Sequence, residues 1–286
     1  MNQVKIGNKI VGGNTNVKFT AELGVNHLGS FERAKEMIDS SLNAGSDFLK
    51  FQTYISEERY DKINNPHGKK FVENLSKWEF KREVDKELWE YAKKKGAQIF
   101  TTPFDVKSLE FAEELGSIAY KIAAFEINNH VLINEICKTN KPIIISRGMC
   151  SLQEMDEVVN LFEKNKSKYI ILHTISSYPL RKVDSHLNMI GTLKRRYSCP
   201  IGHSDHTHGT EIPPLAVAAG AEMIEKHFTV NPKLRESDNF FSVTEEEVKE
   251  IKFLIDKVKS YMGSDNIEKI ETEDFMWNFR RDTRKK

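Results

Sequence analysis

Cationic and hydroxyl side chains recur at the ends of short apolar segments in this chain, a pattern typical of an anion-binding pocket. Lys50 and Lys121 lie inside segments that are otherwise apolar, and lysine is rarely buried unless a partner or ligand neutralises it. Arg147 ends another apolar segment, and the hydroxyls of Thr102 and Ser146 occupy similar positions. Together these groups predict a pocket that binds phosphate and carboxylate through charge-assisted hydrogen bonds.

Two histidines follow the same pattern. His206 and His227 end two neighbouring apolar segments, where both imidazoles can reach one divalent ion. Two imidazoles with open positions for water make a Lewis-acid site that accepts manganese, magnesium or cobalt as readily as zinc. We interpret His173 as structural. We expect three further histidines to be solvated: His186, His203 and His208.

Carboxylate, amide and hydroxyl groups also lie at or just beyond the segment ends. Glu22 ends the first segment and has two interpretations, as a structural partner of a lysine or as a catalytic group. Glu225 ends the last segment together with His227. The other polar residues near segment ends are Gln52, Glu126, Ser176, Tyr178 and Ser204.

Eight apolar segments separated by amphipathic ones must position these groups. Gly45 ends the clearest helical pattern, and Ser151 with Glu154 predicts a capping box at the start of another helix. Alternating strands and helices predict a parallel sheet, and eight such units predict a (β/α)₈ TIM barrel of the α/β class, with its site at the carboxyl ends of the strands. The predicted strands are residues 19–25, 48–53, 98–103, 119–124, 142–146, 169–176, 200–204 and 223–229.

An open doubly wound sheet is the alternative architecture. It favours a GxGxxG turn after the first strand, whereas this chain has NHLGS there. A short hairpin around Gly7 is expected to precede the barrel. We expect the barrel to occupy residues 1–263, and residues 264–286 to form a C-terminal helix or tail. The long polar segment 54–85 is expected to be a lid or binding loop, or to contain a short helix of its own.

Composition narrows the functional classes. The chain has 43 Lys and Arg residues against 42 Asp and Glu residues, so overall charge does not favour nucleic acid or an anionic membrane as a partner. Three widely spaced cysteines argue against a disulfide framework or a structural zinc site. Neither an apolar signal region nor a run long enough to span a membrane is apparent, and we expect a reducing, cytoplasmic location.

Eight stretches, in order from about residue 20 to 245, resemble a known family, the N-acetylneuraminate (sialic acid) synthases with their pseudaminic and legionaminic acid relatives. No single stretch is decisive, but all of them fall at matching strand ends. They read AELGVNHLGSFERAKEMID, AGSDFLKFQTY, TTPFD, AYKIAAFEINN, KPIIISRGM, HTISSYP, IGHSDHT and EKHFT.

The resemblance implies a reaction and a division of roles. The family joins phosphoenolpyruvate to the aldehyde of N-acetylmannosamine or a related hexose, forming a nine-carbon 2-keto acid and phosphate. A divalent metal, typically Mn²⁺, would be bound by His206 and His227. The implied catalytic residues are Glu22, Lys121, His206 and His227. Phosphoenolpyruvate would contact Lys50, Thr102, Lys121 and Ser146, and the sugar side would comprise Gln52, Glu126, Ser176, Tyr178, Ser204 and Asp238.

The chain departs from the family pattern in four places. Ala124 replaces a serine of the phosphoenolpyruvate pocket, and Arg147 replaces a threonine. We hypothesise that Arg147 restores the lost contact. Glu236 and Ser237 stand where the family has glycine-proline before Asp238, and Asn239 follows where histidine is common. The family's antifreeze-like C-terminal domain, which supplies an arginine to the sugar, is not expected in these residues. Either the sequence is truncated or this is a naturally short member, and in the second case segment 54–85 is our candidate to cover the sugar. A homodimer is expected from the resemblance alone.

Three other functions remain open. A synthase of the 3-deoxy-octulosonate 8-phosphate type would keep the barrel and phosphoenolpyruvate but use a sugar phosphate. A lyase or aldolase would use a lysine such as Lys121 for a Schiff base, although paired metal histidines make that lysine redundant. A non-catalytic barrel serving as a binding subunit would need neither the buried lysines nor the histidines.

Overall fold

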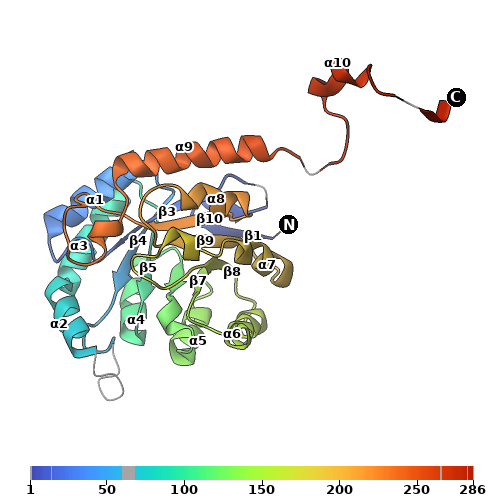
Figure 1. Cartoon of the computed structure of the whole chain (residues 1–286). Coiled ribbons are helices and arrows are strands. Elements are labelled where there is room, and N and C mark those ends of the chain that lie inside the picture. Colours follow the sequence, from blue (N-terminus) through green and yellow to red (C-terminus); the bar gives the residue numbers. More distant parts are fainter. Residues whose placement is uncertain (1, 14, 60–67, 265, 282, 286) are drawn as a thin grey trace.

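The computed structural model is a closed barrel of eight parallel strands surrounded by helices, as the alternating pattern predicts (Figure 1). It describes residues 2–13, 15–59, 68–264, 266–281 and 283–285. The strands follow each other around the barrel in chain order, and the last pairs with the first. They are β3 (Lys18–Gly24), β4 (Phe48–Thr53), β5 (Ile99–Pro103), β6 (Tyr120–Ile122), β7 (Ile143–Arg147), β8 (Tyr169–His173), β9 (Ile201–Asp205) and β10 (Met223–His227).

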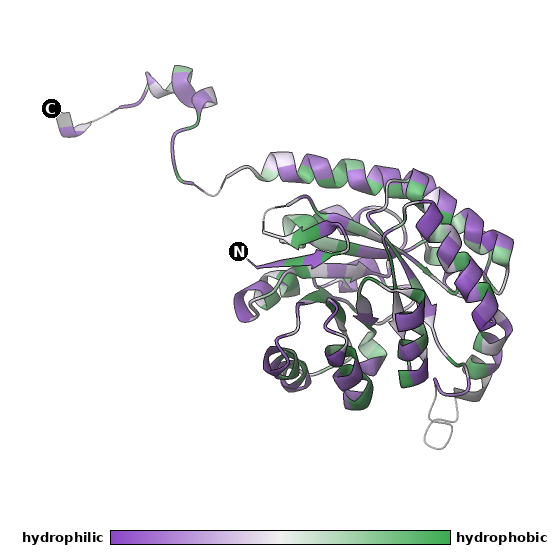
Figure 2. Cartoon of the chain, turned by 180° about the vertical axis from the view of Figure 1, so that it is seen from behind, coloured by the Kyte–Doolittle hydropathy of each residue, from purple (hydrophilic) through white to green (hydrophobic). Residues whose placement is uncertain are grey.

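Helices cover the outside of the barrel. Their apolar faces pack on the strands and their polar faces point outward, as the purple outer surfaces in Figure 2 show. The predicted capping box of Ser151 and Glu154 is present, and Gly45 ends the first helix with a φ of +77°. The helices are α1 (Phe31–Asn43), α2 (Gly68–Trp78), α3 (Arg82–Lys94), α4 (Val106–Leu115), α5 (His130–Lys138), α6 (Leu152–Lys164), α7 (Asn188–Arg196), α8 (Ile212–Ala218) and α9 (Glu245–Met262).

The predicted hairpin closes the amino end of the barrel. Strands β1 (Gln3–Ile6) and β2 (Lys9–Gly12) pair antiparallel, and they bury Val4, Ile6 and Val11 in one cluster with the side chains that fill the barrel interior. The interior is therefore packed at this end, and a pocket can open only at the carboxyl ends of the strands.

Three predicted strands extend two or more residues too far, and one of them is the last strand, because β10 ends at His227 and not at residue 229. β6 ends at Ile122, because Ala124–Glu126 form a 3-10 turn, and β8 ends at His173, before Ser176. Segment 54–85 contains a helix of its own, α2, and its residues 60–67 lie outside the described residues.

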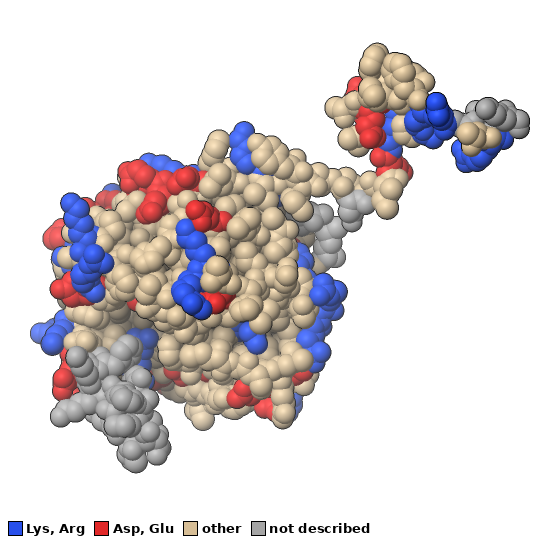
Figure 3. Space-filling model, in the orientation of Figure 1, with Lys and Arg blue, Asp and Glu red and all other residues tan. Residues whose placement is uncertain are grey.

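After α9 the described chain leaves the barrel and carries a short helix, α10 (Asp274–Trp277), as Figure 1 shows. None of the helices in the described part of the chain has the length and apolar character needed to cross a membrane. Lys and Arg are interspersed with Asp and Glu on the face shown in Figure 3, in keeping with the balanced charge of the chain.

Candidate active site

A pocket of about 390 Å³ opens among the ends of the barrel strands. The structure brings eleven predicted site residues together in its lining: Glu22, Lys50, Gln52, Thr102, Lys121, Ser146, Tyr178, Ser204, His206, His227 and Asp238. Ala124 also lines it, as the resemblance implies. Strand geometry explains the convergence, because residues two apart on one strand point to the same face.

Three predicted site residues lie outside this lining: Glu126, Arg147 and Ser176. Glu126 follows β6 in the 3-10 turn, where its carboxylate accepts a hydrogen bond from Asn129 at 2.7 Å. The Arg147 guanidinium donates to Met189 Sδ and to the Cys150 carbonyl, both at 3.4 Å. The hypothesis that Arg147 restores a phosphoenolpyruvate contact therefore disagrees with its placement.

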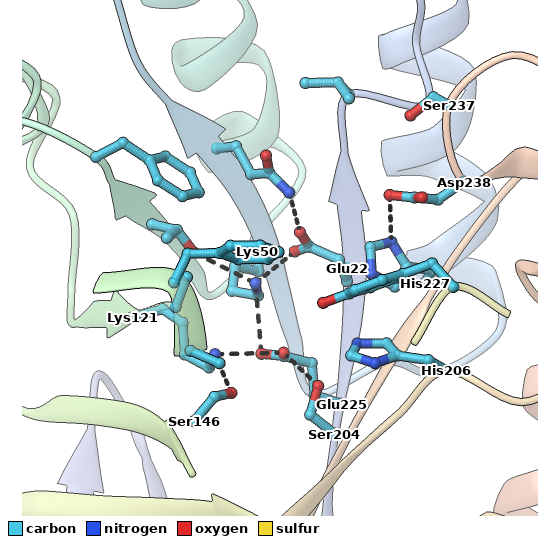
Figure 4. A pocket seen from close by; sticks show the side chains of 18 of the residues that line it. Glu22, Lys50, Lys121, Ser146, Ser204, His206, Glu225, His227, Ser237 and Asp238 are labelled. Carbon is cyan, nitrogen blue, oxygen red and sulfur yellow. Dashed lines mark hydrogen bonds and ion pairs between the residues drawn. The ribbon is translucent and has the colours of Figure 1, made fainter. Parts of the chain in front are cut away.

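Two lysines and two glutamates form the floor of the pocket (Figure 4). Lys50 Nζ lies 2.8 Å from Glu22 Oε2 and 3.5 Å from Glu225 Oε2. Lys121 Nζ lies 3.6 Å from Glu225 Oε1 and donates to Ser146 Oγ at 2.6 Å. All four charged side chains are buried. The predicted cationic pocket is thus a compact cluster in which each ammonium faces a carboxylate.

The cluster drives the pKa values of the two carboxyls in opposite directions. Burial raises the pKa of Glu22 above its ordinary value, and Lys50 offsets only part of that increase. Burial also disfavours ionised Glu225, but Lys121 and Lys50 outweigh burial and hold its pKa at about 2. Two carboxyls with opposed pKa shifts are the arrangement in which one group carries a proton and the other stays ionised.

The two lysines also differ. Burial lowers the pKa of Lys121 to about 8, although Glu225 raises it. Burial acts in the same direction on Lys50, but Glu22 and Glu225 together outweigh it, so the pKa of Lys50 is raised. Lys50 therefore stays cationic at neutral pH, whereas Lys121 loses its proton close to neutral pH.

The two predicted metal histidines lie side by side in the pocket, with ring centroids 5.5 Å apart (Figure 4). His206 Nδ1 lies 3.0 Å from the Ile175 carbonyl, and His227 Nδ1 lies 3.5 Å from Asp238 Oδ2. Burial lowers the pKa of His206 to about 3 and also lowers that of His227. Two neutral imidazoles can each offer a ring nitrogen to a divalent ion, so these side chains fit one; in His206 the Ile175 carbonyl occupies Nδ1, which leaves Nε2 as the ligand atom.

The described residues form no cluster of three or more His, Cys, Asp or Glu side chains that could hold a metal. A divalent ion held by His206 and His227 alone would have open positions for water or substrate, as a Lewis-acid site requires. Tyr178 lies against this pair, 4.2 Å from His206 and 6.3 Å from His227 between ring centroids.

Two charged residues of the pocket received no role from the sequence. Glu225 had a usable signal, because it lies two residues before His227 on one strand and so shares its face. Arg59 had none beyond its place in segment 54–85. Its guanidinium lies 3.5 Å from the centroid of the Phe104 ring and donates to Gln52 Oε1 at 3.2 Å. Asn74, Leu75 and Trp78 of the same segment also line the pocket.

The outer histidines follow the predictions except in one case. His173 is fully buried and its Nε2 lies 2.8 Å from the Ser185 carbonyl, in keeping with a structural role. His186 and His208 are exposed. The expectation that His203 is solvated is wrong. It is fully buried and stacks on His173, because it points from β9 toward the helices rather than toward solvent.

The chain is similar to known proteins over most of its length. A model described as the NeuB family matches residues 37–267. An uncharacterized protein of Methanocaldococcus jannaschii is 37% identical over 92% of this chain and 77% of that protein. The N,N′-diacetyllegionaminic acid synthase of Legionella pneumophila is 35% identical over 85% of this chain and 72% of that protein. A solved structure, the N-acetylneuraminic acid (sialic acid) synthetase of Leptospira borgpetersenii in complex with citrate, has a TM-score of 0.91 at 37% identity, and the match covers 100% of this chain and 98% of that chain.

Proposed function

Because this chain belongs to the NeuB family, we propose that it is an enzyme that condenses phosphoenolpyruvate with the aldehyde of an N-acetylated hexose and with water. The products are a nonulosonic acid and phosphate. N-acetylmannosamine, or a relative with further acylamino groups, is the acceptor class. The observation that carries the proposal is that Lys50, Lys121, His206 and His227 line one buried pocket.

The two lysines would hold the anionic substrate. Lys50 and Lys121 approach Glu225 from two sides, at 3.5 and 3.6 Å. The hydroxyls of Thr102 and Ser146 accept hydrogen bonds from these two lysines, at 3.3 and 2.6 Å. The phosphate and carboxylate of phosphoenolpyruvate would occupy the space above these groups through charge-assisted hydrogen bonds.

His206 and His227 would hold a divalent ion, for which we propose Mn²⁺. When bound, the ion supplies Lewis-acid polarisation of the aldehyde oxygen. Tyr178, whose ring lies 4.2 Å from that of His206 between centroids and is tilted by 36°, limits the movement of that ring. Asp238 Oδ2 lies 3.5 Å from His227 Nδ1, within ion-pair distance but without a hydrogen bond.

Glu22 would carry a proton between the reacting groups. In the reaction, C3 of phosphoenolpyruvate bonds to the aldehyde carbon, water adds to C2, and the C2–O bond to phosphate breaks. One proton of the water ends on the new hydroxyl and the other on the released phosphate. Glu22 suits this transfer because burial raises its pKa and Gln52 Nε2 donates to Oε1 at 2.9 Å, which fixes the carboxyl.

Phosphate release tests the proposal. The chain would be incubated with phosphoenolpyruvate, Mn²⁺ and a panel of N-acetylated hexoses, with a pentose phosphate as the acceptor of the rival synthase. We expect release with one N-acetylated hexose and none in His206→Ala/His227→Ala. The matched control is His186→Ala/His208→Ala, which removes two exposed histidines and should leave release unchanged.

The other outcomes are informative. Release with the pentose phosphate alone would identify the octulosonate type of synthase. Binding of phosphoenolpyruvate in calorimetry without release on any acceptor would refute the acceptor class. Absence of phosphoenolpyruvate binding would refute the proposal as a whole.

A further inference from the structure

The separation of the two pocket histidines is not set by the backbone ladder between their strands. The β9–β10 ladder ends at the pair Asp205 and Lys226. His206 lies one residue beyond the end of β9, and His227 pairs on its other side with Glu22 of β3. Another contact between β9 and β10 must therefore hold the two imidazoles at a fixed spacing.

The residue just before each histidine provides that contact. Side chains alternate along a strand, so Asp205 and Lys226 point to the side opposite His206 and His227. Neither lines the pocket. Lys226 Nζ lies 2.5 Å from Asp205 Oδ2, and both side chains are buried, at 1% exposure each.

The same ion pair fixes the backbone on both sides of His206. Lys226 Nζ also donates to the Thr207 carbonyl, at 2.6 Å. The Asp205 carboxylate accepts from the Thr207 amide at 3.0 Å and from its hydroxyl at 3.2 Å. Residues 205 and 207 are thus tied to a lysine of β10, and His206 is held between them.

A buried ion pair is a poor source of stability alone, because removing two charges from water costs about as much as their attraction returns. Asp205 and Lys226 each immediately precede a pocket histidine, and this placement indicates a role in fixing the relative position of the two histidines instead. Groups that orient metal ligands have measurable effects on metal affinity.

We propose that Asp205 and Lys226 are positioning residues, which hold His206 and His227 at the spacing that binds a divalent ion. The inference rests on the proposed function only in that the two histidines are taken to bind that ion. The ion pair of Asp205 and Lys226 lies on the outer side of the barrel wall, whereas the other groups of the proposed site lie inside the pocket.

The test measures Mn²⁺ binding by the full chain without substrates, using calorimetry and electron paramagnetic resonance. In Asp205→Asn/Lys226→Met both charges are removed, so no unpaired charge is left buried. We expect the Mn²⁺ dissociation constant to rise about tenfold or more, while the thermal unfolding midpoint and circular dichroism stay close to those of the unmodified chain.

The matched control removes another lysine–aspartate pair in the same way. Lys9 Nζ lies 2.8 Å from Asp47 Oδ1, and this pair joins the β1–β2 hairpin to the turn before β4, at the opposite end of the barrel. Lys9→Met/Asp47→Asn should leave the Mn²⁺ dissociation constant unchanged. Lys226→Arg is a second test, which keeps the charge but replaces the single nitrogen that joins Asp205 to the Thr207 carbonyl; it too should weaken Mn²⁺ binding.

Mn²⁺ affinity within about twofold of the unmodified chain in a folded variant would overturn the proposal. So would failure of both variants to fold, because the pair would then serve the barrel as a whole. Absence of Mn²⁺ binding by the unmodified chain would also overturn it. Mn²⁺ binding without phosphate release on any acceptor would refute the proposed function and leave the positioning role standing.

Discussion

Replacement of Glu225 by glutamine should lower the free energy of unfolding by about 3 kcal/mol at pH 7. The Glu225 carboxylate is buried against Lys50 and Lys121, and these two ammonium groups hold its pKa at about 2 instead of 4.5. Each pKa unit corresponds to ~1.4 kcal/mol. The result agrees with the ~3–5 kcal/mol typical of removing one partner from a buried ion pair.

The sign of the pH dependence follows from the direction of this shift. The pKa of Glu225 is depressed on folding, so its contribution is present above the unfolded pKa of about 4.5 and is lost as pH falls toward about 2. From about pH 5 to 6 the difference between the two proteins should therefore be constant, whereas nearer pH 8 it also includes the titration of Lys121, whose pKa Glu225 raises. In thermal unfolding it should appear as a decrease of roughly 5 °C, given the entropy of unfolding expected for a chain of this length.

The assay is urea denaturation of both proteins at pH 7, with Glu211→Gln as the matched control. Glu211 also pairs with a lysine, at 2.6 Å from Lys182, but both side chains are largely exposed. An exposed pair contributes about 0–1 kcal/mol, so the control should differ little from the unmodified protein. Equal effects of the two substitutions would refute the reasoning, because burial of the cluster would then have no energetic consequence.

Three further predictions each follow from the position of one residue. Arg147→Thr should leave the KM for phosphoenolpyruvate unchanged, because the guanidinium lies outside the pocket lining; an increase in steady-state assays would contradict this placement. The KM for phosphoenolpyruvate should increase between pH 7 and 9, because Lys121, with a pKa of about 8, loses its charge in that range; a flat KM profile would contradict the role of its ammonium. Gly202→Ala should cost about 1–3 kcal/mol of stability, because the new Cβ would meet the Met223 carbonyl at 2.5 Å. The control Gly191→Ala, at a half-buried position of α7 with its nearest contact at 3.4 Å, should instead gain up to about 1 kcal/mol in the same denaturation assay.

The strand pattern predicted the barrel and most of the pocket for one physical reason. Parallel strands that close into a barrel bring all their carboxyl ends to one face, so polar residues at those ends converge without any knowledge of tertiary contacts. Lys50 with Gln52, and Ser204 with His206, also obey the two-residue alternation of a strand.

The residues that lie elsewhere than expected mark the places where that alternation was not applied or does not hold. Ser146 and Arg147 are adjacent on β7, so only one of them can face the barrel interior, and the pocket takes Ser146. The same rule places His203 on the outer side of β9, next to Ser204. Ser176 lies beyond the end of β8, where strand periodicity no longer fixes direction.

Arg59 could not be predicted, because its place in the pocket depends on the path of a long connection. It follows β4 by several residues and reaches the pocket through contacts with Phe104 and Gln52. Neither contact has a local sequence signature. By contrast, the ion pair of Asp205 and Lys226 has a local sequence signature, since two opposite charges occupy the last ladder positions of neighbouring strands.

The charges of the pocket explain why the histidine pair and the lysine–glutamate cluster belong to one site. The described lining carries as many cationic as anionic side chains: Lys50, Arg59 and Lys121 against Glu22, Glu225 and Asp238. A balanced lining gives no net attraction for a multiply charged anion such as phosphoenolpyruvate, even though each lysine is well placed to contact it. For the proposed substrate, the additional positive charge would come from a divalent cation, or from a proton on Glu22, the carboxyl whose pKa is raised. A cation at the histidine pair and a proton on Glu22 would lie at the same side of the pocket, since Glu22 pairs with His227 in the β3–β10 ladder. Because the lining charges balance, anion binding would depend on the histidine pair and on Glu22, which are the groups that carry out the proposed reaction.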